Sequence, residues 1–138
     1  LAPALTFPAA RYWLPTLAGR EVDLPVRSDA HGQFWTTRYP SQAVLPMAAL
    51  VKAVREMSFD ATDVPVLFYY SDADKVVRPD LTAAVAAAWG GAAQVHLVPA
   101  DVLEDPHGHI LAGDVVVPGQ TASAVGEILR WLREQGFE

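Results

Sequence analysis

The stretch PVLFYYSDADKVV, residues 65–77, decides how this chain folds. Its first part, Pro65 to Tyr70, is a short run of apolar, β-branched and aromatic residues without alternation. Such a run is typical of a strand that is buried on both faces. The polar residues from Ser71 to Lys75 then end the strand. The stretch therefore predicts a strand of a covered sheet, followed by a loop rich in carboxylates.

Downstream of this strand, the patterns of a helix and of a second strand follow. Pro79 opens a stretch with apolar residues at helical spacing, and Gly90 and Gly91 end it. Residues 94–98 again have the composition of a strand. Strand, helix and strand in this order predict a βαβ unit with parallel strands and a right-handed crossover.

The C-terminal part of the chain ends in a helix. A polar loop over residues 100–120 precedes it, and the helix is predicted over residues 121–135. Thr121 or Ser123 is the candidate N-cap, and Gly136 lies just past the end. Two parallel strands are too few for a sheet buried on both faces, so we expect further strands to be missing from this chain.

Upstream of the first strand the patterns are weaker. Residues 1–42 contain scattered prolines and aromatics without periodicity, which predicts an irregular, loop-rich segment with short helical turns. Residues 43–58 are predicted to form a helix that packs into the core through apolar residues at i, i+3, i+4 and i+7, namely Met47, Leu50, Val51 and Val54. We therefore predict two segments, an irregular one over 1–42 and an ordered one over 43–138.

Composition excludes several classes of protein. The 138 residues contain no cysteine, which excludes disulfides, a thiolate nucleophile and cysteine-ligated metals. The net charge of −6 argues against nucleic acid as a partner, and no apolar run is long enough for a membrane span. The N-terminus has no basic region ahead of an apolar stretch, as a secretory signal would, and we expect a cytoplasmic protein.

Titratable residues gather in the two loops that follow the predicted strands. Because the carboxyl ends of neighbouring parallel strands share one edge of the sheet, the two loops should lie side by side. A carboxylate of the first loop can then fix the tautomer of an imidazole of the second. The first loop carries Asp72 and Asp74, and the second carries Asp101, Glu104, Asp105, His107, His109 and Asp114.

Residues 65–77, together with GHILAGD over residues 108–114, resemble the C-terminal part of serine hydrolases of the α/β-hydrolase fold. The likeness is to the lysophospholipase and monoacylglycerol-lipase-like branch, and it extends from about residue 64 to residue 136. It implies an α/β chain with a partial α/β-hydrolase fold, in which residues 1–42 are a cap-like segment and residues 43–138 form the C-terminal part of the core. It also implies that Asp74 is the acid of a catalytic triad and His109 its histidine. Asp72 and His107 stand as alternatives for these two roles.

The nucleophile of that family is missing from this sequence. None of the five serines has a glycine two positions before it and two positions after it, as the family's Gly-x-Ser-x-Gly motif requires. We expect the motif upstream of Leu1, which makes this chain the C-terminal fragment of an enzyme that cleaves carboxylic esters of apolar substrates. The resemblance implies no cofactor. The chain by itself is predicted to be inactive.

Other interpretations of the histidines remain open. His107 and His109 at i, i+2 can share a metal ion, although the further ligands of the familiar zinc motif are absent. We interpret His96 as a partly buried residue of the core and His31 as a polar loop residue. A different class of function is a non-catalytic domain that binds a partner or forms a homodimer through uncovered apolar surface.

Overall fold

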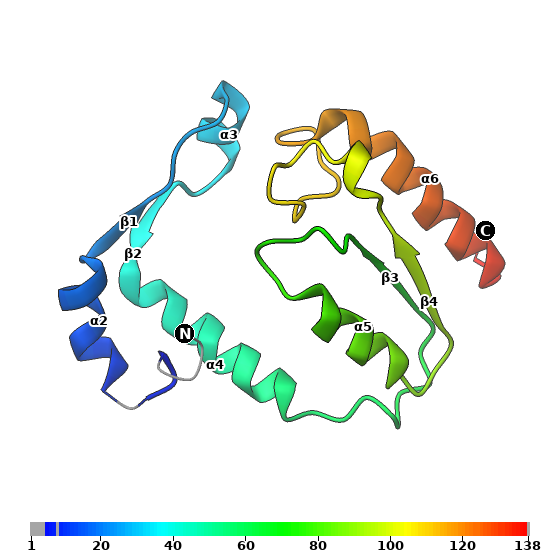
Figure 1. The fold of residues 1–138 in the computed structure, drawn as a ribbon, viewed down its shortest axis with the longest axis horizontal. Helices are drawn as coiled ribbons and strands as arrows, with labels where there is room; N and C mark the ends of the chain where they lie inside the picture. The colour runs from blue at the N-terminus through cyan, green and yellow to red at the C-terminus, as the bar shows by residue number, and fades with distance from the viewer. Residues whose placement is uncertain (1–4, 8, 138) are drawn as a thin grey trace. The chain divides into compact units, whose positions relative to one another are not determined.

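The computed structural model describes residues 5–7 and 9–137. The chain forms two compact units, Leu1–Met57 and Ser58–Glu138 (Figure 1). Helices and strands are mixed, and the second unit contains a parallel pair of strands, so the chain is of the α/β class. The structure places the predicted helix after residue 43 in the first unit. The assignment of residues 1–42 to a cap stays a prediction.

The βαβ unit predicted from the sequence is present in the second unit (Figure 1). Strand β3 spans Val66–Tyr70, helix α5 spans Pro79–Ala87 and strand β4 spans Ala93–Leu97. The two strands are parallel, with Val66 opposite Ala93 and Tyr70 opposite Leu97. Pro79 lies in the first turn of α5, where the missing amide proton costs no helical hydrogen bond.

Helices α5 and α6 cover opposite faces of this sheet. Phe68 and Tyr69 are adjacent in β3 and therefore point to opposite faces. Phe68 meets the ring of Trp89, just past α5, edge to face at 5.9 Å. Tyr69 stacks on His96, whose Nδ1 lies 3.1 Å from the carboxylate of Glu127 in α6, and Figure 1 shows the strands between the two helices. His96 is half-buried, as its predicted place in the core required.

Helix α6 spans Pro118–Glu134 and begins three residues before the predicted start. The N-cap predictions, Thr121 and Ser123, were wrong, because both residues lie inside the helix. Pro118 takes the first turn, and Val117 at the N-cap position makes no capping hydrogen bond with its side chain. The hydroxyl of Thr121 accepts a hydrogen bond from the amide of Gly113, 3.0 Å away. The predicted end holds, since Gly136 has a positive φ of 85° just past the helix.

Strand β3 is less buried than predicted. All five of its residues are half-buried and none is fully buried, and β4 alternates between exposed and half-buried residues. The prediction of burial on both faces holds only in part, because helices lie on both faces of the sheet but β3 itself is half-buried. The reason is that β3 pairs with β4 alone among the described residues, which leaves its other edge without a neighbour.

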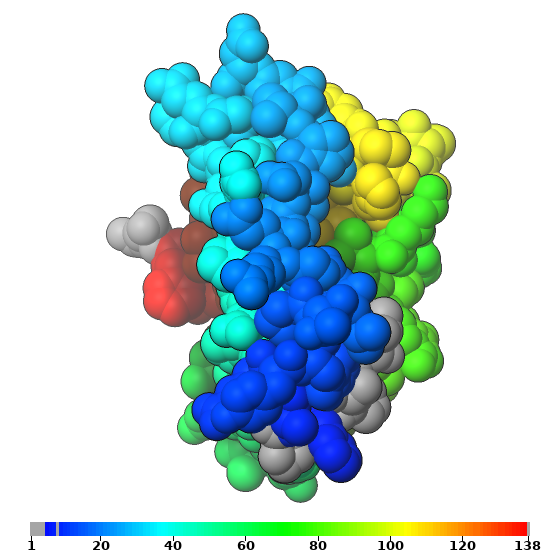
Figure 2. All heavy atoms as spheres, turned by 90° about the vertical axis from the view of Figure 1, so that its left-hand side faces the viewer, coloured from blue at the N-terminus to red at the C-terminus, as the bar shows by residue number. Residues whose placement is uncertain are grey.

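The first unit is more regular than the loop-rich segment predicted. Helix α2 spans Ala10–Ala18, and the short strands β1, Glu21–Asp23, and β2, Arg38–Pro40, form an antiparallel pair. Helix α3, Asp29–Phe34, lies between the two strands in sequence. A 3₁₀ turn at Ser41–Ala43 leads into helix α4, Val44–Arg55. Figure 2 shows the surface of this unit, with the blue residues of α2 and the paler blue residues near α3 at its two ends.

His31 is not the polar loop residue that the sequence suggested. It lies in α3, is buried, and packs against Trp35 with ring centroids 5.6 Å apart. Its Nδ1 accepts a hydrogen bond from the amide of Arg27 at 3.2 Å, and its own amide donates to the hydroxyl of Ser28 at 3.1 Å. Ser28 is the N-cap of α3, a short helix that sequence periodicity cannot detect.

Helix α4 forms where it was predicted but does not bury the predicted face. Leu50 is 64% exposed, and the other residues of the stripe, Met47, Val51 and Val54, are exposed as well. Ala48 is the buried residue of this helix. The prediction that the stripe packs into the core was therefore wrong within the first unit, because no described residue of that unit covers it.

Candidate functional site

The site begins where β3 ends, at Ser71. Its side chain is buried, and its hydroxyl donates a hydrogen bond to the carbonyl of Val98 at 2.9 Å. The same oxygen accepts from the amide of Ala73 at 3.3 Å. Ser71 thereby joins the turn that follows β3 to the end of the neighbouring strand β4.

Asp74 lies at the end of this turn, and one oxygen of its carboxylate is held by hydrogen bonds from the main chain. The amides of Val76 and Val77 donate to Oδ1 at 2.7 and 3.0 Å. Such bonds from the following amides are typical of an aspartate that shapes a turn. The second oxygen, Oδ2, is left to face the loop that follows β4.

The loop that follows β4 and carries His107 and His109 is called the histidine loop. Three contacts bring it against the turn of Asp74. The amide of Lys75 donates to the carbonyl of His107 at 2.8 Å, and Lys75 Nζ donates to the carbonyl of Pro106 at 2.9 Å. The third contact is the close approach of Gly108, which has a φ of +64°. A Cβ there would lie 2.8 Å from the carbonyl oxygen of Ala73, so only glycine fits. The two loops lie side by side, as the βαβ arrangement predicts.

The pair predicted from the sequence lies within hydrogen-bonding distance. His109 Nδ1 is 2.9 Å from Asp74 Oδ2, although 35 positions separate the two residues. The carboxylate of Asp74 is 7% exposed, whereas the ring of His109 is 41% exposed. Because a carboxylate only accepts, the proton of a neutral ring belongs on Nδ1, and the lone pair is on Nε2. Among the described residues, none forms a hydrogen bond with Nε2.

Opposing influences act on the carboxyl group of Asp74. Partial burial is the largest single one, and it acts to raise the pKa. The hydrogen bond from His109, those from the amides of Val77 and Val76, and the charge of His109 act in the other direction. Together they hold the pKa of Asp74 below its ordinary value of 3.8. Asp74 is therefore a carboxylate at neutral pH.

The two alternatives raised by the sequence lie elsewhere. His107 does not face Asp74, since its Nδ1 lies 3.7 Å from a carboxylate oxygen of Asp105. Asp72 is exposed and forms no hydrogen bond or ion pair with a described residue. The geometry therefore brings together Asp74 and His109 and leaves both alternatives outside the pair.

The described residues offer no metal site. They contain no group of three or more histidine, aspartate or glutamate side chains arranged to hold an ion. His107 and His109 turn to different carboxylates, so they do not converge on one point. The interpretation of these two histidines as ligands of one ion therefore has no support in the geometry.

Sequence reasoning missed the role of Asp105, which had only been counted among the charged residues of its loop. Its carboxylate is buried and accepts hydrogen bonds from the amides of His109 and Ile110, both at 3.1 Å. The available signal was the Asp105-Pro106 dipeptide, since aspartate before proline favours the start of a turn.

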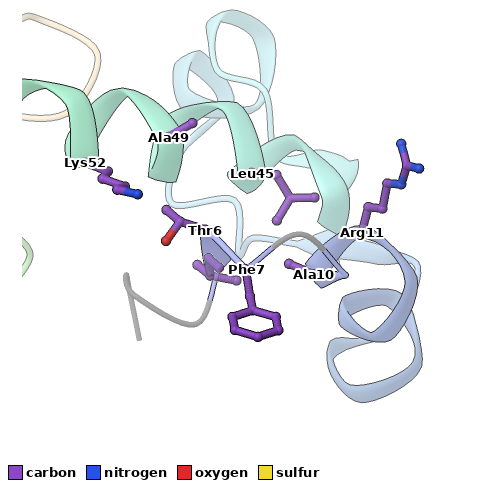
Figure 3. Close-up of a pocket in the computed structure, with 8 residues that line it drawn as sticks. Thr6, Phe7, Ala10, Arg11, Leu45, Ala49 and Lys52 are labelled. Atoms are coloured by element: carbon purple, nitrogen blue, oxygen red, sulfur yellow. The ribbon is translucent and has the colours of Figure 1, made fainter.

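The first unit contains a separate hollow of about 370 Å³ between α2 and α4. Figure 3 shows Leu45, Ala49 and Lys52 projecting from α4, and Ala10 and Arg11 from the start of α2. Its lining contains neither member of the Asp74–His109 pair. No described helix is both long enough and apolar enough to span a bilayer.

Comparison with models of protein families, with curated proteins and with solved structures found no match to this chain.

Proposed function

We propose that this chain supplies the acid and the base of a serine hydrolase that cleaves carboxylic esters, of the lipase and lysophospholipase kind. The observation that carries the proposal is the 2.9 Å contact between Asp74 Oδ2 and His109 Nδ1. The half-exposed ring adds support, because its other nitrogen can reach a hydroxyl outside the described residues.

In this mechanism each member of the pair has one task. Asp74 holds the ring of His109 in the Nδ1-protonated form and stabilises the imidazolium that develops. His109 Nε2 takes the proton of a serine hydroxyl while the serine oxygen forms a bond to the ester carbonyl carbon. The imidazolium then gives this proton to the departing alcohol. Water, activated by the same nitrogen, hydrolyses the acyl-enzyme.

The nucleophile and the oxyanion hole are to be provided by a segment outside these 138 residues. Among the serines of the chain, Ser71 is buried and donates its proton to the carbonyl of Val98. None of the five lies in the nucleophile motif of the family. The proposal thus has the chain act as part of a larger active site, with no turnover of its own.

The surroundings of the pair favour an apolar substrate. Val76 and Val77 lie two and three positions after Asp74 and are both exposed, Val76 by 61%. Ile110 and Leu111 follow His109 and are half-buried. Apolar side chains beside a catalytic pair suit an acyl chain or a lipid alcohol better than a charged substrate.

The test begins with the reading frame that encodes the chain. We expect a Gly-x-Ser-x-Gly sequence roughly 100 residues before Asp74, as the Ser, acid, His order of the family requires. The protein that contains both parts should hydrolyse a nitrophenyl ester. His109→Ala should lower kcat/KM about 10,000-fold, the effect of losing a triad member.

The matched control is His107→Ala, which removes the neighbouring imidazole. It should leave kcat/KM within about a factor of 3, because the side chain that it removes is largely exposed and does not contact Asp74. Equal losses in both variants would contradict the assignment of His109. Ester hydrolysis by the 138-residue chain alone, if abolished by His109→Ala, would contradict the missing nucleophile.

A second candidate is a domain that associates with itself, and the exposed stripe of α4 is the observation in its favour. Among the described residues β3 pairs with β4 alone, so its other edge is open. Open strand edges are templates for association, which also favours this candidate. Sedimentation velocity separates the candidates. A monomer at all concentrations removes the homodimer, whereas a dimer that dissociates on Leu50→Glu supports it.

A further inference from the structure

Asp105 is a buried carboxylate beneath the histidine loop. The residue is 3% exposed, in a unit whose other charged groups lie mostly at the surface. A buried carboxylate is costly unless it is hydrogen-bonded, so its contacts show what it does for the fold.

Those contacts hold the backbone on both sides of one residue. Oδ2 accepts hydrogen bonds from the amides of His109 and Ile110, each at 3.1 Å. The two amides precede and follow the Cα of His109, so one oxygen fixes the position from which the imidazole projects. The carbonyl of Asp105 also accepts from the amide of Gly108 at 2.9 Å.

The other carboxylate oxygen lies near the competing histidine. Oδ1 of Asp105 is 3.7 Å from Nδ1 of His107, whereas Asp74 contacts His109. Each of the two imidazoles therefore has a different carboxylate as its neighbour, Asp74 from the preceding loop for His109 and Asp105 for His107.

We propose that Asp105 is a positioning residue that selects His109, rather than His107, as the partner of Asp74. It fixes the main chain of His109 through two amides and keeps the ring of His107 on its own side of the loop. The catalytic meaning of this selection rests on the proposed function. The positioning itself is a property of the 138-residue chain and needs no nucleophile.

The test measures the tautomer of His109 in the chain itself by two-bond ¹H–¹⁵N correlation spectroscopy of the imidazole rings above pH 8. In the unmodified chain the proton should be on Nδ1. In Asp105→Ala we expect His109 to revert to the Nε2-protonated form that free histidine prefers. The matched control is Asp101→Ala, which removes an exposed carboxylate of the same loop and should leave the ring unchanged.

Asp105→Asn keeps an oxygen that can accept both amides but removes the charge. This variant should retain the proton on Nδ1, and the amides of His109 and Ile110 should exchange with solvent about 10-fold faster, because an uncharged acceptor binds them more weakly. Unchanged exchange in Asp105→Asn overturns the proposal even if Asp105→Ala fails to fold. An unchanged tautomer in a folded Asp105→Ala overturns it as well.

The outcomes for the two proposals are distinct. If His109 of the unmodified chain already has its proton on Nε2, the pair with Asp74 is absent and the proposed function fails. If the unmodified chain shows Nδ1 protonation and a folded Asp105→Ala does not alter it, only the role of Asp105 fails.

Discussion

The buried histidine of the first unit and the aspartate–histidine pair of the second are held by contacts of different range along the sequence. In the first unit, the buried His31 is held by Ser28 and Arg27, which are three and four positions away. In the second, Asp74 meets His109 across 35 positions, and Ser71 meets Val98 across 27. The first network follows from one turn of chain, whereas the second requires two parallel strands to end at the same edge.

This difference explains why the candidate chemistry lies in the second unit. A local network can stabilise a short helix, but it leaves little freedom to bring different side chains together. A βαβ crossover places two independent loops side by side, so each can contribute one reacting group. Three predictions test how strongly the two units differ, in order of expected size.

The largest effect should come from Gly108→Ala. The added Cβ would lie 2.8 Å from the carbonyl of Ala73, at a backbone angle that only glycine adopts easily. We expect the second unit to lose about 2–3 kcal/mol of stability. Hydrogen exchange followed by mass spectrometry should show faster exchange in the loops of Asp74 and His109, with the first unit unchanged.

The control for this substitution is Gly126→Ala, within α6, where the added Cβ meets no atom within 4 Å. It should stabilise the same unit by about 0.5–1 kcal/mol through better helix propensity. Equal destabilisation by both variants would show that the close approach at Gly108 is unimportant.

A smaller effect should appear as acid sensitivity of the second unit. The pKa of Asp74 is lower in the folded chain than its ordinary value of 3.8, so its contribution to stability is complete above that value. The contribution is lost as the pH falls through the folded-state pKa. Asp74→Asn should cost about 1 kcal/mol at neutral pH and flatten the loss of stability below pH 4.

Urea titrations of both proteins at a series of pH values measure this difference. Parallel curves for the unmodified chain and Asp74→Asn would mean that the carboxylate gains nothing from its three hydrogen bonds.

The smallest effect should come from Leu50→Gln in α4. Leu50 is 64% exposed, so the free energy of unfolding should change by less than about 0.5 kcal/mol. Ala48→Leu is the matched change at the buried position of the same helix and should cost about 1–3 kcal/mol by overpacking. Thermal unfolding of both variants measures the two changes. A loss of stability well above about 0.5 kcal/mol for Leu50→Gln would show that the stripe is covered.

The parts that could be predicted from the sequence are those with strong patterns. The apolar run before Ser71 and the helical spacing after Pro79 indicated the βαβ unit, and the topology of such a unit brought Asp74 within reach of His109. Nothing in the spacing distinguished His109 from His107, because that choice depends on Asp105, whose burial is a tertiary property. The antiparallel pair of β1 and β2 is three residues long on each side, too short for any periodicity.

Helix α4 shows the other limit of prediction. Periodicity reveals that Met47, Leu50, Val51 and Val54 share a face, but it does not reveal whether another segment covers that face. The same limit applies to β3, whose composition suits a central strand while the described chain gives it one neighbour.

The hydrogen bonds from Ser71 to Val98 and from Lys75 to His107 have a consequence for dynamics. They continue the pairing of the two strands past the last residues of the sheet and into the loops. Loops at strand ends are ordinarily the first segments to open, because the strand ends fray. Here the loops can open only if hydrogen bonds that belong to the same cooperative unit as the strand pair are broken. The lifetime of the aspartate–histidine contact is therefore tied to that of the strand pair beneath it.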